Sequence, residues 1–307
     1  MNVKKLRGSL FLLLASIIWG AAFVAQDEGM KYVGAFTFNG IRMLIGAAVL
    51  VPVILIFCKK TTQSGKTIPD ILPTKTEWLA GVLCGVVLFI SSSLQQIGIS
   101  LYTDSQAAAG KAGFITALYI VIVPVLGLFA RKKVSSSVWL GIILAIMGMY
   151  MLCMTGGLSL SAPDIFVLLC AVAFSFHILT VDKFAPLVNG IKLSAIQFAV
   201  CGGLSSVCMF IFEKPSLSGI LGAAIPILYA GVLSNGVAYT FQILGQKYTE
   251  PTVASILMSL ESVFAAITGA MFGERLSLRE LIGCVLVFLA VIISQLDFGT
   301  IFKRKSH

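Results

Sequence analysis

Repeated apolar runs, each about 17 to 25 residues long, constrain this chain more than any other feature. A helix of that length crosses the hydrocarbon core of a bilayer. The composition agrees, because 58% of the 307 residues are hydrophobic and only 11% are charged. The pattern predicts an all-α integral membrane protein with ten transmembrane helices, at residues 7–26, 35–57, 78–99, 105–130, 136–154, 164–182, 193–212, 225–245, 252–272 and 277–297.

Lysine and arginine are distributed unevenly between the segments that join these runs. Segments on the side of the N-terminus carry 16 of the 22 basic residues, and segments on the other side carry 4. Because basic loops tend to stay in the cytoplasm, this bias predicts a multi-pass protein of the cell membrane with both termini cytoplasmic. The formal charge of +9 follows from that topology, so the expected partner is a bilayer with an anionic inner leaflet and not nucleic acid.

The residues that usually hold metals or cofactors are scarce or scattered. Seven cysteines lie in or beside apolar runs without a CxxC pair, and His177 and His307 are the only histidines. We interpret the cysteines as small core residues. The sequence has no HExxH motif, no pair of acids at catalytic spacing and no nucleotide-binding loop. We therefore expect no cofactor, no metal site and no catalytic residue.

The chain also matches itself weakly at offsets near 150 residues. At an offset of 155, Arg42 falls on Gln197, and at an offset of 142, residues 117–119 fall on 259–261. These matches predict two repeats of five helices each. Because five is odd, the second repeat must enter the membrane from the opposite side, which makes the repeat inverted. The predicted repeats are residues 1–154 and 155–307.

Three stretches resemble one family across essentially the whole chain: IIWGAAFVA at 17–25, FNGIRMLIGAA at 38–48, and ILMSLESVFAAITGAMFGERLSLRELIGCVLVFLAVII at 256–293. They are similar to the EamA family of the drug/metabolite transporter superfamily. The last stretch is the most specific, and it departs from the family pattern at Ser262, where a proline usually follows the glutamate.

The resemblance implies a fold and an activity. It implies a central cavity lined mainly by the first, third, fourth, sixth, eighth and ninth helices, with the fifth and tenth at the periphery. Known members mostly export amino acids and other small metabolites or allow them to pass. A small molecule is thus the expected substrate of this chain, which we expect to be a monomer or a homodimer.

Two basic residues, Lys111 and Arg42, fall inside predicted spans. A rise of 1.5 Å per residue places both roughly 10 Å below the predicted outer surface, near Gln95 and Gln96. Together they would make a cationic, polar site suited to a carboxylate. The alternative for Lys111 is that its side chain snorkels to the interface, and the alternative for Arg42 is a structural tie between helices.

Glu261 lies about 15 Å from both membrane surfaces, where its short side chain cannot reach water. A charged carboxylate is costly there, so the residue is a candidate for proton coupling or for pairing with Arg42 or Lys111. A neutral acid that only ties helices together is the alternative. His177 is the second candidate for proton coupling, although a lone histidine in a membrane is more often a buried neutral imidazole.

Three further residues are candidates for contact with the substrate: Trp19, which is beside Gly20 in the first span, and Tyr119 and Asn235, which lie near mid-depth of their helices. Tyr119 and Asn235 can donate hydrogen bonds to a ligand or across helices. Trp19 can form a wall of the cavity or pack against a neighbouring helix.

The leading hypothesis is a secondary transporter, and not an enzyme, that moves a small polar metabolite by alternating access. An amino acid or related compound, carried by export or exchange, is the expected substrate. The alternatives are a passive channel and, with less support, a membrane enzyme acting on a lipid-linked substrate.

Overall fold

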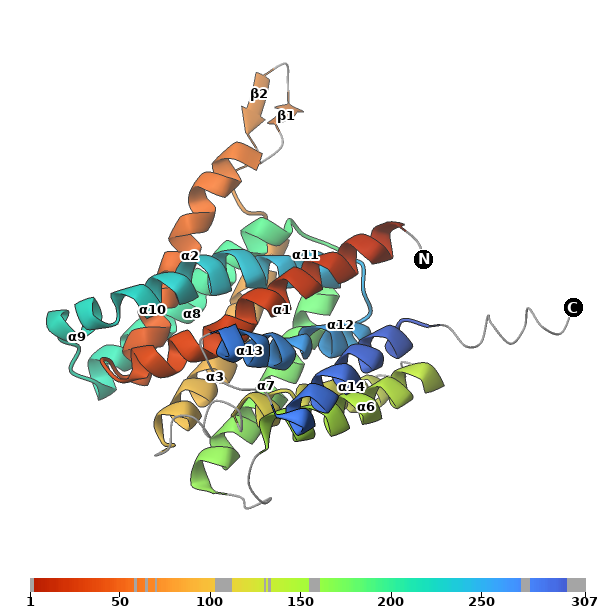
Figure 1. Ribbon diagram of the computed structural model, residues 1–307. Helices are drawn as coiled ribbons and strands as arrows, with labels where there is room; N and C mark the ends of the chain where they lie inside the picture. Colours follow the sequence, from red (N-terminus) through yellow and green to blue (C-terminus); the bar gives the residue numbers. More distant parts are fainter. Residues whose placement is uncertain are drawn as a thin grey trace, which may run out of the picture.

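The computed structural model is a bundle of helices from which a small β-hairpin projects (Figure 1). The hairpin pairs β1 (Lys60–Gln63) with β2 (Lys66–Pro69) in antiparallel register. The all-α membrane fold is otherwise confirmed. The structure describes residues 3–57, 60–63, 66–69, 71–102, 112–129, 131, 134–154, 161–271 and 277–296.

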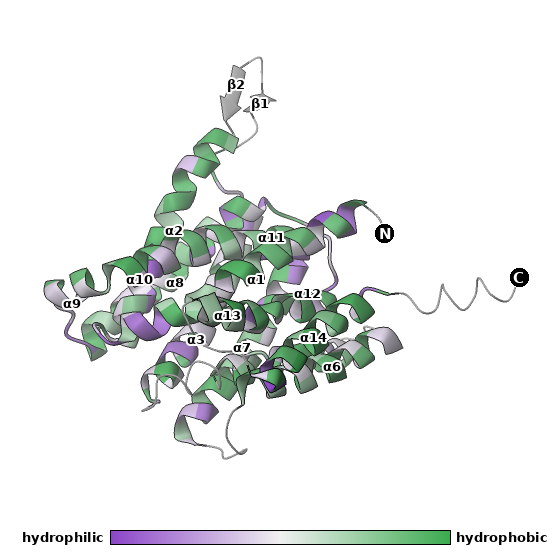
Figure 2. Ribbon diagram, viewed as in Figure 1, coloured by the Kyte–Doolittle hydropathy of each residue, from purple (hydrophilic) through white to green (hydrophobic). Residues whose placement is uncertain are grey.

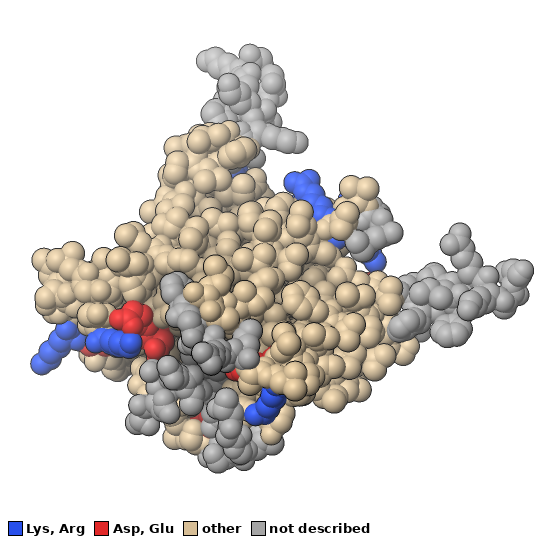
Figure 3. All heavy atoms as spheres, in the orientation of Figure 1, with Lys and Arg blue, Asp and Glu red and all other residues tan. Residues whose placement is uncertain are grey.

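Nine helical stretches in these ranges are long and apolar enough to cross a membrane, and α14, with 17 residues, lies at the tenth predicted span. In Figure 2 the helices are mostly coloured as hydrophobic, and in Figure 3 the visible face of the described residues shows few charged side chains. The helices in the first half are α1 (Val3–Met30), α2 (Ala35–Phe57), α3 (Lys75–Ser100), α5 (Tyr119–Phe129) and α6 (Ser136–Cys153). Those in the second half are α7 (Ala162–Phe184), α8 (Gly190–Phe212), α9 (Leu217–Gly222), α10 (Ala224–Leu228), η1 (Tyr229–Tyr239), α11 (Thr240–Gln246), α12 (Pro251–Met258), α13 (Leu260–Met271) and α14 (Leu278–Ser294).

Three of the spans are interrupted, which hydropathy does not predict. A turn at residues 117–118 precedes α5, and another break at Ser259 separates α12 from α13. These two breaks fall on positions that the 142-residue offset aligns. The third interrupted span runs through α10, η1 and α11, and η1 is a π-helix, a wider form that is frequent at functional sites.

Contacts between helices are arranged in corresponding pairs. α2 packs on α8, and α6 packs on α14. The α3–α7 contact has a counterpart between η1 and α1, and the α3–α8 contact has one between η1 and α2. Exchanging first-half for second-half helices reproduces each of these pairs. The two repeats and their inverted orientation stay predictions.

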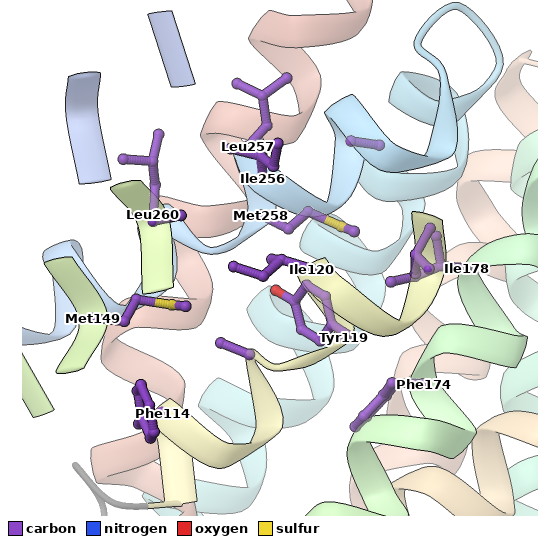
Figure 4. Close-up of a cluster of buried hydrophobic side chains, with 14 of the residues drawn as sticks. Phe114, Tyr119, Ile120, Met149, Phe174, Ile178, Ile256, Leu257, Met258 and Leu260 are labelled. Atoms are coloured by element: carbon purple, nitrogen blue, oxygen red, sulfur yellow. The ribbon is translucent and has the colours of Figure 1, made fainter. Parts of the chain in front are cut away.

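Helices α6 and α14 approach each other closely through two glycines. A Cβ on Gly148 would lie 2.7 Å from the carbonyl oxygen of Gly283, and a Cβ on Gly283 would lie 2.6 Å from that of Gly148. Any larger side chain at either position would therefore force the backbones apart. The same helices contribute Met149 and Val287 to the main hydrophobic cluster, part of which Figure 4 shows.

Polar contacts tie the helix ends together on both faces of the bundle. On the face where α1 begins, which we call the N-terminal face, the buried Lys192 of α8 donates to Glu77 of α3 at 3.5 Å. On the opposite face, the hydroxyl of Tyr102 donates to Asp164 of α7 at 2.6 Å. Burial raises the pKa of Tyr102, and this hydrogen bond raises it further, so the hydroxyl stays a donor. These contacts fix how α3 meets both α7 and α8.

Glu213, just after α8, binds the first turn of α2 on that opposite face. Its carboxylate accepts hydrogen bonds from the backbone N–H groups of Phe36 and Thr37, both at 2.8 Å, and from the Thr37 hydroxyl at 2.6 Å. A negative charge is favourable at a helix N-terminus. We expect Glu213→Gln to lower the free energy of unfolding by about 2 kcal/mol in detergent, because charge-assisted bonds are lost. The control Glu28→Gln, at an exposed glutamate, should have little effect, and an equal loss in both variants would contradict the expectation.

Candidate functional site

A cavity lies inside the bundle where helices from both halves of the sequence meet. Its volume is about 60 Å³, enough for several water molecules. Every long helix of the described residues contributes to its wall except α6, α8 and α14. The lining residues are Trp19, Ala22, Phe23, Gln26, Arg42, Gln95, Thr116, Tyr119, Phe174, Ile178, Ser234, Tyr239, Gln242, Met258 and Glu261. We call this the central cavity.

Five of the predicted site residues line the central cavity: Trp19, Arg42, Gln95, Tyr119 and Glu261. They come from α1, α2, α3, α5 and α13, and they are brought together from positions up to 242 residues apart in the chain. The resemblance led to an expectation of six lining helices, and Arg42 adds α2 to that set. Whether these residues bind substrate stays a prediction.

Arg42 is the one positively charged residue among the described lining residues, and it is held by neutral groups. Its Nε donates to Asn39 Oδ1 at 3.1 Å and its Nη1 to Gln26 Oε1 at 3.3 Å. The guanidinium carbon also lies 5.6 Å from the centre of the Phe38 ring. No carboxylate of the described residues lies within 4.0 Å of it. Nη2 of the guanidinium has no hydrogen bond to a described residue and can donate to another acceptor.

Glu261 is the one acidic residue among the described lining residues. Its Oε1 accepts a hydrogen bond from the Tyr119 hydroxyl at 3.3 Å, and only 6% of the residue is exposed. The two residues follow the breaks at 117–118 and 259, so each interruption positions one of the bonded groups. The predicted pair between Glu261 and Arg42 is not formed. Glu261 Oε2 has no bond to a described residue, and it remains a free acceptor.

Aromatic rings form much of the wall near these charged groups. The rings of Trp19 and Tyr239 meet edge to face with centroids 4.8 Å apart. Tyr239 also contacts the rings of Phe198 and His177, at 5.9 and 6.2 Å. Trp19 thus both packs against a neighbouring helix and faces the cavity, so the two predicted roles are combined. Rings in this arrangement offer apolar contact and a negative face to a cation.

The two adjacent glutamines of α3 have different surroundings. Gln95 lines the cavity, and its Nε2 lies 3.4 Å from the Thr116 hydroxyl. Gln96 points elsewhere, and its Nε2 lies 3.0 Å from the Met30 sulfur. Neighbours in a helix point about 100° apart, and here Gln96 is turned toward Met30 while Gln95 faces the cavity. Of this pair, the structure brings only Gln95 to the site.

His177 and Asn235 lie beside the cavity without lining it. His177 Nε2 is 3.1 Å from Gln197 Oε1, and its ring meets edge to face the ring of Tyr239, which lines the cavity. Asn235 is fully buried in η1, with its Cβ against Gly46 of α2. Neither amide atom of Asn235 has a hydrogen-bond partner in the described part of the chain.

Lys111, a leading candidate from the sequence, lies outside the described residues, so both predicted positions of its side chain, in the cavity or at the interface, stay predictions.

Two residues that line the cavity, Gln26 and Tyr239, were not predicted from the sequence. The signal for Gln26 was available, because it is a polar residue in the first predicted span. Nothing in the sequence singles out Tyr239, since aromatic residues are common in membrane helices. The described residues contain no group of three histidines, cysteines or acids that could hold a metal.

These features define a class: a multi-pass helical membrane protein with a polar cavity enclosed by interrupted helices. The profile of the EamA-like transporter family matches residues 6–154 and again residues 161–296, so the chain belongs to that family. This confirms the resemblance seen in the sequence.

Two relatives named as transporters agree with this assignment, and a solved structure shares the fold. An uncharacterized transporter of Archaeoglobus fulgidus is 28% identical over 303 residues, covering 96% of this chain and 88% of the relative. The uncharacterized transporter YoaV of Bacillus subtilis is 22% identical over 299 residues, covering 94% of this chain and 97% of the relative. A crystal structure with 17% identity superimposes with a TM-score of 0.75 over 94% of this chain and 96% of the other, which shows a shared fold.

Proposed function

We propose that this EamA-type transporter moves a small polar metabolite, an amino acid or a related compound, by alternating access. The observation that carries the proposal is the central cavity, which is lined by Arg42 from the first half and by Glu261 from the second half. Each of these residues keeps a polar atom free for a ligand. No reaction is proposed, and no cofactor is required.

The substrate class follows from the charges and rings of the cavity. The free Nη2 of Arg42 suits a carboxylate, to which it can donate a charge-assisted hydrogen bond. Glu261 and the neighbouring rings of Trp19 and Tyr239 suit an ammonium group. One cationic and one acidic residue fit a ligand that carries both charges, as an amino acid does. Lys111 remains proposed as a further cation for the carboxylate.

Alternating access is supported by how the halves meet. The hydrogen bond from Tyr119 to Glu261 joins α5 in the first half to α13 in the second, at the two helix breaks. Broken helices near a midplane site are typical of transporters whose halves move against each other. We propose that Glu261 exchanges a proton or a substrate ammonium group at this position, with export or exchange as the direction. For His177, a proton-coupling role is proposed only through Tyr239, because it does not reach the cavity.

The cellular setting belongs to the same proposal. The excess of Lys and Arg on the N-terminal face supports a cell-membrane protein with both termini in the cytoplasm and with the basic loops against anionic lipid. The protein is proposed to work as a monomer or homodimer.

Counterflow in liposomes tests the proposed function. Purified protein in vesicles preloaded with an unlabelled amino acid should accumulate the labelled compound transiently, and the initial rate should saturate as its concentration rises. Empty vesicles are the control. Flux that rises linearly without saturation would indicate a channel, and no counterflow across amino acids, organic acids and amines would overturn the proposal.

A further inference from the structure

A second cavity opens beside the central cavity, toward the N-terminal face. Its volume is about 530 Å³, and its wall comes from α5, α7 and the turn between α11 and α12. We call it the inner vestibule. It is lined by Val123, Gly127, Val134, Leu179, Asp182, Pro186, Gln246, Lys247, Tyr248, Thr249, Glu250, Pro251 and Thr252.

The two cavities are separated by a thin partition. On α7, Ile178 lines the central cavity and the next residue, Leu179, lines the inner vestibule. On α11, Gln242 lines the central cavity and Gln246, one helical turn later, lines the vestibule. Since one turn of helix is about 5.4 Å long, little material lies between the two spaces.

Two neutral hydrogen bonds close this partition. Gln242 Nε2 donates to Gln246 Oε1 at 3.1 Å, and Gln246 Nε2 donates to the backbone carbonyl oxygen of Ile178 at 3.0 Å. Both glutamines are 2% exposed. Of these three residues, Gln246 is the one whose side chain is bonded both to α11, through Gln242, and to α7, through Ile178. It is also the last residue of α11, next to the turn that leads to α12.

We propose that Gln246 latches a gate between the central cavity and the inner vestibule, and that substrate passes here when the gate opens. This inference rests on the proposed transport function for its biological meaning. The latch uses amides without charge, so breaking it leaves no buried ion. Gln242 Oε1 is buried without a partner in the described residues, so the bonded set is incomplete in the closed form.

A third cavity on the same face is a poorer route. It is lined by residues of α1, α6 and α14 together with the start of α12, among them Ser9, Val138 and Ser294. Ser9 is ten residues before Trp19 on α1, which is about 15 Å along the helix. No lining residue of this cavity is within one helical turn of a residue that lines the central cavity.

The test measures access to a cysteine in the central cavity. Ser234→Cys is a near-isosteric change at a lining residue of η1, and the unmodified protein gives the background labelling of native cysteines. A membrane-impermeant maleimide is added to the N-terminal face of sealed vesicles, with orientation established by protease cleavage of an N-terminal tag. Labelling of Ser234→Cys should be slow in the parent and about tenfold faster when Gln246→Leu is added, because two neutral hydrogen bonds are lost.

Matched variants separate the latch from general loosening. Gln197→Leu removes another buried glutamine, which is bonded to His177 and lines neither cavity, and it should leave the labelling rate unchanged. If Gln246→Leu does not fold, Gln246→Ala takes its place. Equal labelling rates with and without the Gln246 change, or equal acceleration by Gln197→Leu, would overturn the gate. Labelling needs no transported compound, so a failure of counterflow with accelerated labelling would reject the proposed transport function and leave the gate standing.

Discussion

Replacing Arg42 with glutamine should weaken binding of a carboxylate ligand about 10- to 100-fold, because charge-assisted hydrogen bonds of about 1.5 to 3 kcal/mol are lost. The measurement is thermal unfolding of purified protein with amino acids, their decarboxylated amines and their deaminated acids. A ligand at one hundred times its Kd should add about 2.7 kcal/mol to the wild-type free energy of unfolding. The same ligand should add much less to Arg42→Gln, when each variant is compared with its own ligand-free state.

Arg279 provides a matched control for this substitution. Like Arg42, it lies over an aromatic ring, with its guanidinium carbon 5.5 Å from the centre of Tyr150, and it donates to a neutral acceptor, the Tyr150 carbonyl oxygen. It lies outside the central cavity, so Arg279→Gln should keep the full ligand effect. If an amino acid stabilises Arg42→Gln as much as the wild type, Arg42 does not bind the substrate, and its role is the alternative one of tying α1 to α2.

Glu261→Gln should remove the pH dependence of substrate binding and weaken binding of ligands that carry an ammonium group. In the wild type, protonation of the carboxylate as the pH falls cancels the charge that attracts the ammonium group, so binding should weaken toward low pH. Glutamine keeps a similar shape and cannot titrate. The phenol of Tyr119, which binds Glu261, is of a type that ordinarily titrates near pH 10. The amino acid and its deaminated acid are compared in thermal unfolding over a range of pH.

Glu28 is the control for this experiment, since it is exposed near the end of α1 and bonded to Lys31. Glu28→Gln should keep the wild-type pH profile. An unaltered profile in Glu261→Gln would exclude the proton and ammonium roles of Glu261 together. A changed profile with full binding of the deaminated acid would agree with the proposed orientation, in which Arg42 holds the carboxylate.

Much of the architecture was accessible from the sequence because membrane burial imposes a simple rule on each helix. A backbone in hydrocarbon must satisfy its own hydrogen bonds, so a long apolar run becomes a helix. The helix breaks were less accessible, since the turn before Tyr119 and the break at Ser259 lie inside continuous apolar runs. The self-match aligned these two positions without indicating that either would interrupt a helix.

The site was only partly accessible for a related reason. Polar residues in apolar spans are few, so Arg42, Gln95 and Glu261 stand out by type alone. Their depth was estimated from sequence position, but the direction of each side chain was not. Gln95 and Gln96 share a depth, and only Gln95 lines the cavity. Pairing of Glu261 with Arg42 was one of the alternatives, and the two side chains form no ion pair, since depth alone does not imply contact.

The sequence by itself therefore determined that this chain is a helical membrane protein, which family it belongs to, and which polar residues are costly enough to need a partner or a function. Hydropathy and charge are properties of consecutive residues, so membrane spans can be predicted from them without a structure. The tertiary structure decided which of those residues share one cavity, that neutral amides hold Arg42, that Tyr119 binds Glu261, and that Gln246 binds the backbone of α7. These depend on helix rotation and on contacts between residues far apart in the chain, which packing alone sets.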